Sequence, residues 1–124
     1  MQTEDRIFYY VYFLASAIIF SVVLIMSASK NAERRYQQAK QLVEEGEYYL
    51  AINILDELGN YSDSASIREE LVDSILYDDA KIYYEHGYYE EALALFEDIT
   101  SYKDSEEYYN NTVQFLKDEG RDDK

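Results

Sequence analysis

The sequence predicts an all-α protein: a single transmembrane helix, then a two-repeat helical hairpin domain with a C-terminal capping helix. Two observations support this prediction. Residues 7–28 contain no charge, proline or glycine. The chain that follows aligns with itself without a gap, and Gly46 and Gly87 mark an offset of 41 residues. Repeats of about this length usually form stacked pairs of helices.

The apolar run 7–28 is long enough to cross a bilayer. At about 1.5 Å per residue it spans roughly 33 Å, close to the ~30 Å hydrocarbon core. A buried helix in a soluble core would need apolar partners on every side, and the remaining chain is acidic and too short to supply them. Residues 1–6 form a polar flank. Tyr9, Tyr10 and Tyr12 occupy the place of an interfacial aromatic belt.

A cleaved signal peptide is the alternative for this run, since residues 27–29 are small. The run exceeds the usual apolar length of about 7–15 residues, and Glu4 and Asp5 oppose a positive leader. We therefore expect an uncleaved anchor. One helical face carries small residues that suit homo- or hetero-oligomeric contact with another helix, namely Ala17, Ser21 and Ala28.

Charge is divided unevenly along the chain. Residues 36–124 carry 7 basic and 23 acidic side chains, a formal charge of −16. Such a domain repels nucleic acid and anionic headgroups, so no nucleic-acid partner is expected. The absence of cysteine removes disulfides and thiol chemistry without deciding the compartment.

The first predicted hairpin follows the anchor directly. Nothing breaks a helix from the anchor through a connector at residues 29–35, and this first helix ends at Gly46 in a left-handed C-cap. A second helix spans about residues 48–58 and stops at Gly59. Its apolar side chains recur at three- and four-residue intervals: Ala51, Ile54, Leu55 and Leu58.

The second hairpin repeats the first. Asp63 or Ser64 is expected to N-cap a third helix that ends at Gly87. A fourth helix spans about residues 89–99. Its apolar face resembles that of the second helix: Ala92, Leu95, Phe96 and Ile99.

A fifth helix is expected to cap the domain. Asp104 with Glu107 resembles a capping box at its start, and it frays at Gly120, where a disordered tail of residues 120–124 begins. The repeat domain is thus assigned to residues 36–119, with repeats at 36–76 and 77–117.

The two repeats share residues and carry a family resemblance. Identical pairs are Tyr36/Tyr77, Ala39/Ala80, Lys40/Lys81, Glu44/Glu85, Gly46/Gly87, Tyr48/Tyr89, Ala51/Ala92, Tyr61/Tyr102, Asp63/Asp104, Ser64/Ser105 and Val72/Val113. Segments 46–52 (Gly-Glu-Tyr-Tyr-Leu-Ala-Ile) and 87–93 (Gly-Tyr-Tyr-Glu-Glu-Ala-Leu) resemble the Gly-x-Tyr-x-x-Ala-Ile/Leu core of tetratricopeptide repeats. Two features depart from that family: aspartates replace its usual proline, and the period exceeds its 34 residues. The unit tails, 58–64 and 99–105, are similar to a Tyr-x-Asp-Ser variant found in membrane-anchored proteins of Gram-positive bacteria.

That resemblance implies a partner-binding groove lined by the first helix of each pair. The matching positions are Tyr36, Lys40, Val43, Glu44, Tyr77, Lys81, Tyr84 and Glu85. Two lysines beside tyrosines can hold a peptide carboxylate through charge-assisted hydrogen bonds. The alternative is that each lysine pairs with the glutamate four residues later, an exposed contact worth about 0.3–0.5 kcal/mol.

Few residues offer catalytic chemistry. His86, the only histidine, lies in the last helical turn before Gly87, where a polar cap is unremarkable. The adjacent carboxylates diverge around a helix instead of converging on a substrate. An acidic group near the C-terminus lacks the spacing of a calcium loop: Asp118, Glu119, Asp122 and Asp123. We therefore expect no enzyme activity, cofactor or metal.

Three functions fit these features. The first is a membrane-tethered helical-repeat adaptor that holds a protein or peptide. The second is a small accessory subunit of a membrane complex, held through its transmembrane helix. The third is a membrane-bound receptor for extracytoplasmic ligands. Lys30, Arg34 and Arg35 follow the anchor, so by the positive-inside rule we expect a cytoplasmic domain. The alternative, favoured by the Gram-positive resemblance, is an extracytoplasmic one.

Overall fold

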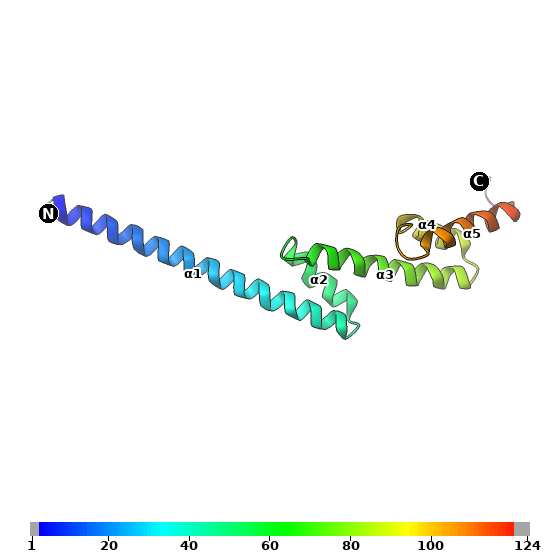
Figure 1. Cartoon of the computed structure of the whole chain (residues 1–124), viewed down its shortest axis with the longest axis horizontal. Helices are drawn as coiled ribbons and strands as arrows, with labels where there is room; N and C mark the ends of the chain where they lie inside the picture. Colours follow the sequence, from blue (N-terminus) through cyan, green and yellow to red (C-terminus); the bar gives the residue numbers. More distant parts are fainter. Residues whose placement is uncertain (1–2, 121–124) are drawn as a thin grey trace. The chain divides into compact units, whose positions relative to one another are not determined.

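The computed structural model describes residues 3–120, which form five α-helices and no strand (Figure 1). The helices are α1 (Thr3–Glu44), α2 (Tyr48–Leu58), α3 (Ser64–Glu85), α4 (Tyr89–Asp98) and α5 (Ser105–Asp118). The all-α prediction is confirmed, and each domain helix ends within two residues of its expected position. Apart from Gly120, the tail expected to be disordered lies outside the described residues. The chain divides into two units, Met1–Tyr61 and Ser62–Lys124.

In the first unit, α1 is one continuous helix of 42 residues. Its apolar part exposes every large side chain from Ile7 to Met26. An 18-residue window in it reaches a mean hydropathy of 2.4, and none of that window is buried. The helix is thus long and apolar enough to span a membrane, and residues 29–35 continue it without a break.

The C-terminal part of α1 packs against α2. Tyr36 and Ala39 are buried on α1, and Ala51 and Leu55 are buried on α2. The Tyr36 ring meets the Tyr61 ring edge-on, with centroids 5.8 Å apart. The small alanines allow the two helices to pack closely, and the aromatic contact joins α1 to the turn that follows α2.

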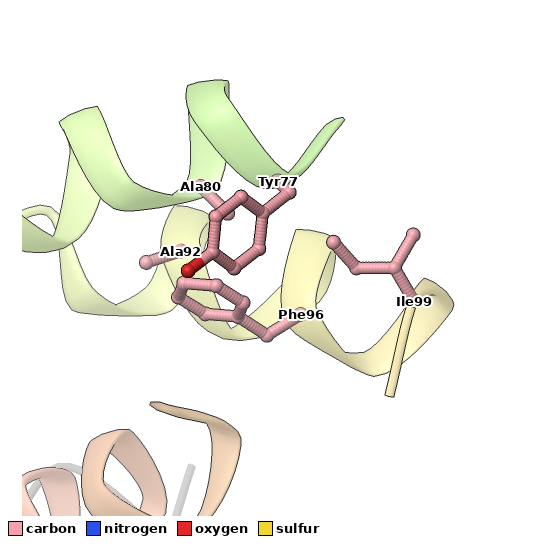
Figure 2. Packing of buried hydrophobic residues seen from close by; sticks show 5 residues of the cluster. All are labelled: Tyr77, Ala80, Ala92, Phe96 and Ile99. Atoms are coloured by element: carbon pink, nitrogen blue, oxygen red, sulfur yellow. The ribbon is translucent and has the colours of Figure 1, made fainter. Parts of the chain in front are cut away.

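The second unit has its core between α3 and α4 (Figure 2). Ala80 and Ala92 are fully buried, so the two helix backbones can approach each other. Phe96 is also fully buried, and its ring stacks on Tyr108 of α5 at a centroid distance of 5.0 Å. The Phe96 side chain therefore joins all three helices of the unit.

The turns of the two units adopt the same backbone conformation at the 41-residue offset. Gly46 and Gly87 have φ of 79° and 81°, the left-handed region that glycine enters without steric cost. Ser62 and Lys103 also have positive φ, 50° and 49°, although both carry a Cβ. The same turn backbone is thus built twice from partly different residues.

The helix starts differ from the expected caps. Neither Asp63 nor Asp104 makes a side-chain capping hydrogen bond, so the proposed capping box of Asp104 and Glu107 is wrong. The Asp104 carboxylate instead accepts a hydrogen bond from the Tyr77 hydroxyl. Glu106 and Glu107 in the first turn of α5 stabilise its N-terminus through the helix dipole.

Candidate functional site

The residues expected to line a partner groove fall into two sets, one on α1 and one on α3. The aromatic member that opens each set, Tyr36 or Tyr77, is buried. The charged members Lys40, Glu44 and Glu85 are exposed. Half-buried side chains complete the sets: Val43, Lys81 and Tyr84. A partner would therefore meet mainly charged groups, supported from below by tyrosines.

Each lysine lies over the ring of the tyrosine four residues before it. The Lys40 Nζ is 5.6 Å from the centroid of Tyr36, and the Lys81 Nζ is 5.4 Å from that of Tyr77. Within residues 3–120, no ion pair joins either lysine to the glutamate four residues after it. The ring faces hold the ammonium groups by cation–π attraction, which leaves their N–H donors directed to other acceptors.

Tyr77 connects several elements of the second unit. Its hydroxyl donates to Asp104 Oδ1 at 2.5 Å, and a second cation, Lys103, lies 4.9 Å from its ring centroid. Its ring contacts three others edge-on: Phe96, Tyr102 and Tyr108. The hydrogen bond to Asp104, followed by burial, raises the pKa of Tyr77 to about 12. Tyr77 is therefore a packing residue that positions Lys81.

A hollow of about 300 Å³ lies in the second unit beside Tyr84. Its other lining residues come from the start of α5: Asp104, Glu107, Tyr108 and Asn111. Spacings of three, four and seven place these four residues on one helical face. Tyr84 is among the residues expected from the sequence to line a groove, whereas the four residues at the start of α5 are not, although their helical spacing is visible in the sequence.

A second hollow, of about 580 Å³, is lined by α1. It includes Lys40 and Glu44 from the expected groove, together with Gln37, Gln41 and Glu45. The Gln41 amide donates to Glu45 at 2.8 Å. This hollow therefore borders the expected set on α1, and the hollow in the second unit borders Tyr84 of the set on α3.

The small residues of the apolar segment are exposed on α1. The Ser21 hydroxyl donates to the Ala17 carbonyl at 2.9 Å, and the Ser16 hydroxyl donates to the Phe13 carbonyl at 2.8 Å. Because both hydroxyls are satisfied within the helix, neither requires a second helix in an apolar environment.

Potential catalytic groups are dispersed. The exposed His86 ring has its Nδ1 2.8 Å from the Ile82 carbonyl oxygen. Across the part of the chain that the structure describes, no three His, Asp or Glu side chains could share a metal ion. Asp122 and Asp123 of the acidic C-terminal group lie outside that part. Comparisons with protein-family models, curated proteins and solved structures return no match for this chain.

Proposed function

We propose that this chain is a membrane-anchored adaptor of the tetratricopeptide-like helical-repeat type, which holds a protein or peptide partner and performs no catalysis. The observation that carries the proposal is the continuity of α1. One helix contains both an exposed apolar segment and the first helix of a packed hairpin. A partner held on the hairpins would thus be kept close to the bilayer.

The two turns with matching backbone support the repeat assignment. Gly46 and Gly87 end the first helix of each pair with nearly equal φ, and the following backbone bonds also correspond. The Glu47 N–H donates to the Leu42 carbonyl and the Tyr88 N–H to the Tyr83 carbonyl, both at 2.9 Å. Corresponding turns are what a tandem helical repeat requires.

The proposed partner-binding residues include Lys40 in the first unit and Lys81 in the second. Cation–π contacts orient both ammonium groups, and their remaining donors suit a partner carboxylate. Because the domain is strongly acidic, an acidic partner group would be attracted only at such local cations. We assign a carboxylate of the partner to each of these lysines separately.

We place the domain on the cytoplasmic side, because Lys30, Arg34 and Arg35 follow the apolar segment whereas Arg6 precedes it. A single cysteine introduced at Asp118 tests this assignment in intact cells. Protection from a membrane-impermeant thiol reagent supports it. Labelling would place the domain outside and favour the receptor alternative.

Site-specific photocrosslinking in native membranes tests the adaptor function. A photoreactive residue replaces Glu85 of the proposed face or, as a control on the opposite side of α3, Asp79; both are exposed. We expect a discrete product from position 85 only, lost in the Lys40→Glu/Lys81→Glu variant. A photoreactive residue is also placed at position 17 or 21 of α1. Products that arise only from these two positions, and that persist in the lysine variant, would overturn the adaptor and support an accessory subunit held through its membrane helix.

A further inference from the structure

Four polar side chains line one hollow of about 350 Å³ at the C-terminal end of the apolar segment of α1. They are Ser27, Lys30, Asn31 and Arg34. Spacings of three, four and seven residues place them on one face of the helix. The face contains two cations, a hydroxyl and a carboxamide, and no carboxylate.

The neighbouring charges are engaged within the first unit. Arg35 forms an ion pair with Glu57 of α2. The Glu33 carboxylate accepts hydrogen bonds from the Tyr61 hydroxyl at 2.6 Å and from the Gln37 amide at 2.8 Å. Within residues 3–120, Glu33 thus forms no ion pair with Lys30 or Arg34, and Arg35 is committed to the α1–α2 packing.

The Ser27–Arg34 face is preorganised to accept an anion. A guanidinium N–H of Arg34 donates to the Asn31 Oδ1 at 3.2 Å, which orients the guanidinium and leaves its other N–H groups available. Lys30 lies one turn nearer to the apolar segment, and within residues 3–120 it forms no ion pair. Two cations on adjacent turns can share one phosphate group through charge-assisted hydrogen bonds.

The height of this face along the helix identifies the anion. Ser27 to Arg34 covers about 10 Å of helix axis, and the polar headgroup layer adds roughly 5–7 Å to each side of the hydrocarbon core. With residues 7–28 in the hydrocarbon core, Lys30 lies about 3 Å and Arg34 about 9 Å beyond it, so the two cations lie on either side of the layer of lipid phosphates. We propose that the Ser27–Arg34 face binds the phosphate of an anionic phospholipid, an inference that rests on the proposed membrane anchoring.

This site would oppose the charge of the rest of the domain. Residues 36–124 carry −16 and are repelled by an anionic surface. Each basic side chain near such a surface strengthens attraction by roughly fivefold, so Lys30 and Arg34 together favour an anionic lipid beside α1. One bound headgroup would fix the depth and rotation of the helix.

Lipid retention by the full chain tests the proposal. The protein is reconstituted in vesicles with equal parts phosphatidylglycerol and phosphatidylcholine, extracted in mild detergent and analysed by native mass spectrometry. The Lys30→Gln/Arg34→Gln variant is compared with Arg68→Gln/Lys117→Gln, which loses one arginine and one lysine elsewhere in the chain. We expect wild type and control to retain phosphatidylglycerol selectively, and the Lys30/Arg34 variant to retain at least about fivefold less. Equal retention by both double variants overturns the proposal.

Two further measurements separate the possible failures. Flotation with the vesicles tests the anchor. A chain that does not float overturns the anchor and the lipid site together, whereas a floating chain with unselective retention overturns only the lipid site.

The second measurement is a titration of inorganic phosphate into the chain in zwitterionic micelles, with the Asn31 side-chain amide observed by NMR. We expect phosphatidylglycerol to shift this signal at far lower concentration than phosphate. Equal potency of the two would overturn the lipid assignment in favour of a soluble phosphate.

Discussion

The Tyr77 hydroxyl and the Asp104 carboxylate are joined by a hydrogen bond of 2.5 Å across 27 residues of sequence. The bond connects the middle of α3 with the residue that precedes α5. Tyr77 also packs against Phe96 of α4. One side chain thus contacts all three helical segments of the second unit, beneath a lysine of the proposed partner face.

Substitution of Tyr77 by Phe should destabilise the second unit in a pH-dependent manner. The folded-state pKa of Tyr77 is about 12, against 10.0 for a free tyrosine. The hydrogen bond therefore contributes its full stability below about pH 10, and this contribution is lost as the pH rises toward 12. At pH 8 we expect Tyr77→Phe to cost about 1–2 kcal/mol, and the gap to wild type should narrow above pH 10. Urea denaturation followed by circular dichroism measures both.

The matched control for this experiment is Tyr88→Phe, which removes a hydroxyl from an exposed tyrosine. It should leave the stability at pH 8 nearly unchanged. A Tyr77→Phe deficit that stays constant from pH 8 to 12 would contradict the proposed role of the hydroxyl.

A side chain added at Gly87 should destabilise the turn only because of the backbone conformation that the turn requires. Its φ is +81°, and a Cβ added there would meet no atom within 4 Å. Gly87→Ala should therefore cost about 1–2 kcal/mol, the penalty of a left-handed residue with a Cβ. Gly87→Asn should cost less, because asparagine tolerates this region. Equal melting temperatures for the Ala and Asn variants would contradict this explanation.

The helix bounds were predictable because their signals are local. Gly46, Gly59 and Gly87 each follow the last residue of a helix's apolar period and adopt positive φ, so the glycine C-cap could be recognised without reference to the rest of the chain. The role of Asp104 was not predictable in this way. Capping rules assign its carboxylate to nearby backbone N–H groups, whereas in the structure it bonds a hydroxyl from another helix.

For the candidate partner residues, too, the local helical pattern was predictable and the packing was not. The helical period places Lys81 and Tyr84 on one face, but it does not reveal that Tyr77 is buried beneath the lysine. The α5 side of the hollow beside Tyr84 also depends on how α5 packs against the rest of its unit. Contacts between distant segments are not encoded in the local periodicity on which the prediction rested.

Phe96 should be the most costly single truncation in the second unit. It is fully buried, contacts Tyr77 edge-on and stacks on Tyr108. Phe96→Ala should cost about 3–5 kcal/mol through lost burial and an unfilled cavity, and should abolish a cooperative melt of this unit. Ile82→Ala, at a side chain 54% exposed on α3, should change stability by less than about 1 kcal/mol. Similar losses from both substitutions would place the core elsewhere.

The Tyr61–Glu33 hydrogen bond should be detectable through the pKa values of both residues. It is the main cause that lowers the pKa of Glu33 and raises the pKa of Tyr61. Its contribution to folding is therefore present between about pH 4.5 and 10, and is lost as the pH falls through the lowered pKa of Glu33 or rises through the raised pKa of Tyr61.

In Tyr61→Phe, the pKa of Glu33, followed by carbon NMR of its carboxylate, should rise toward 4.5. Tyr49→Phe, at an exposed tyrosine of α2, should leave it unchanged. An unaltered Glu33 pKa in Tyr61→Phe would show that this bond does not join α1 to the end of the first unit. Arg35 and Glu57 would then carry the polar part of that contact.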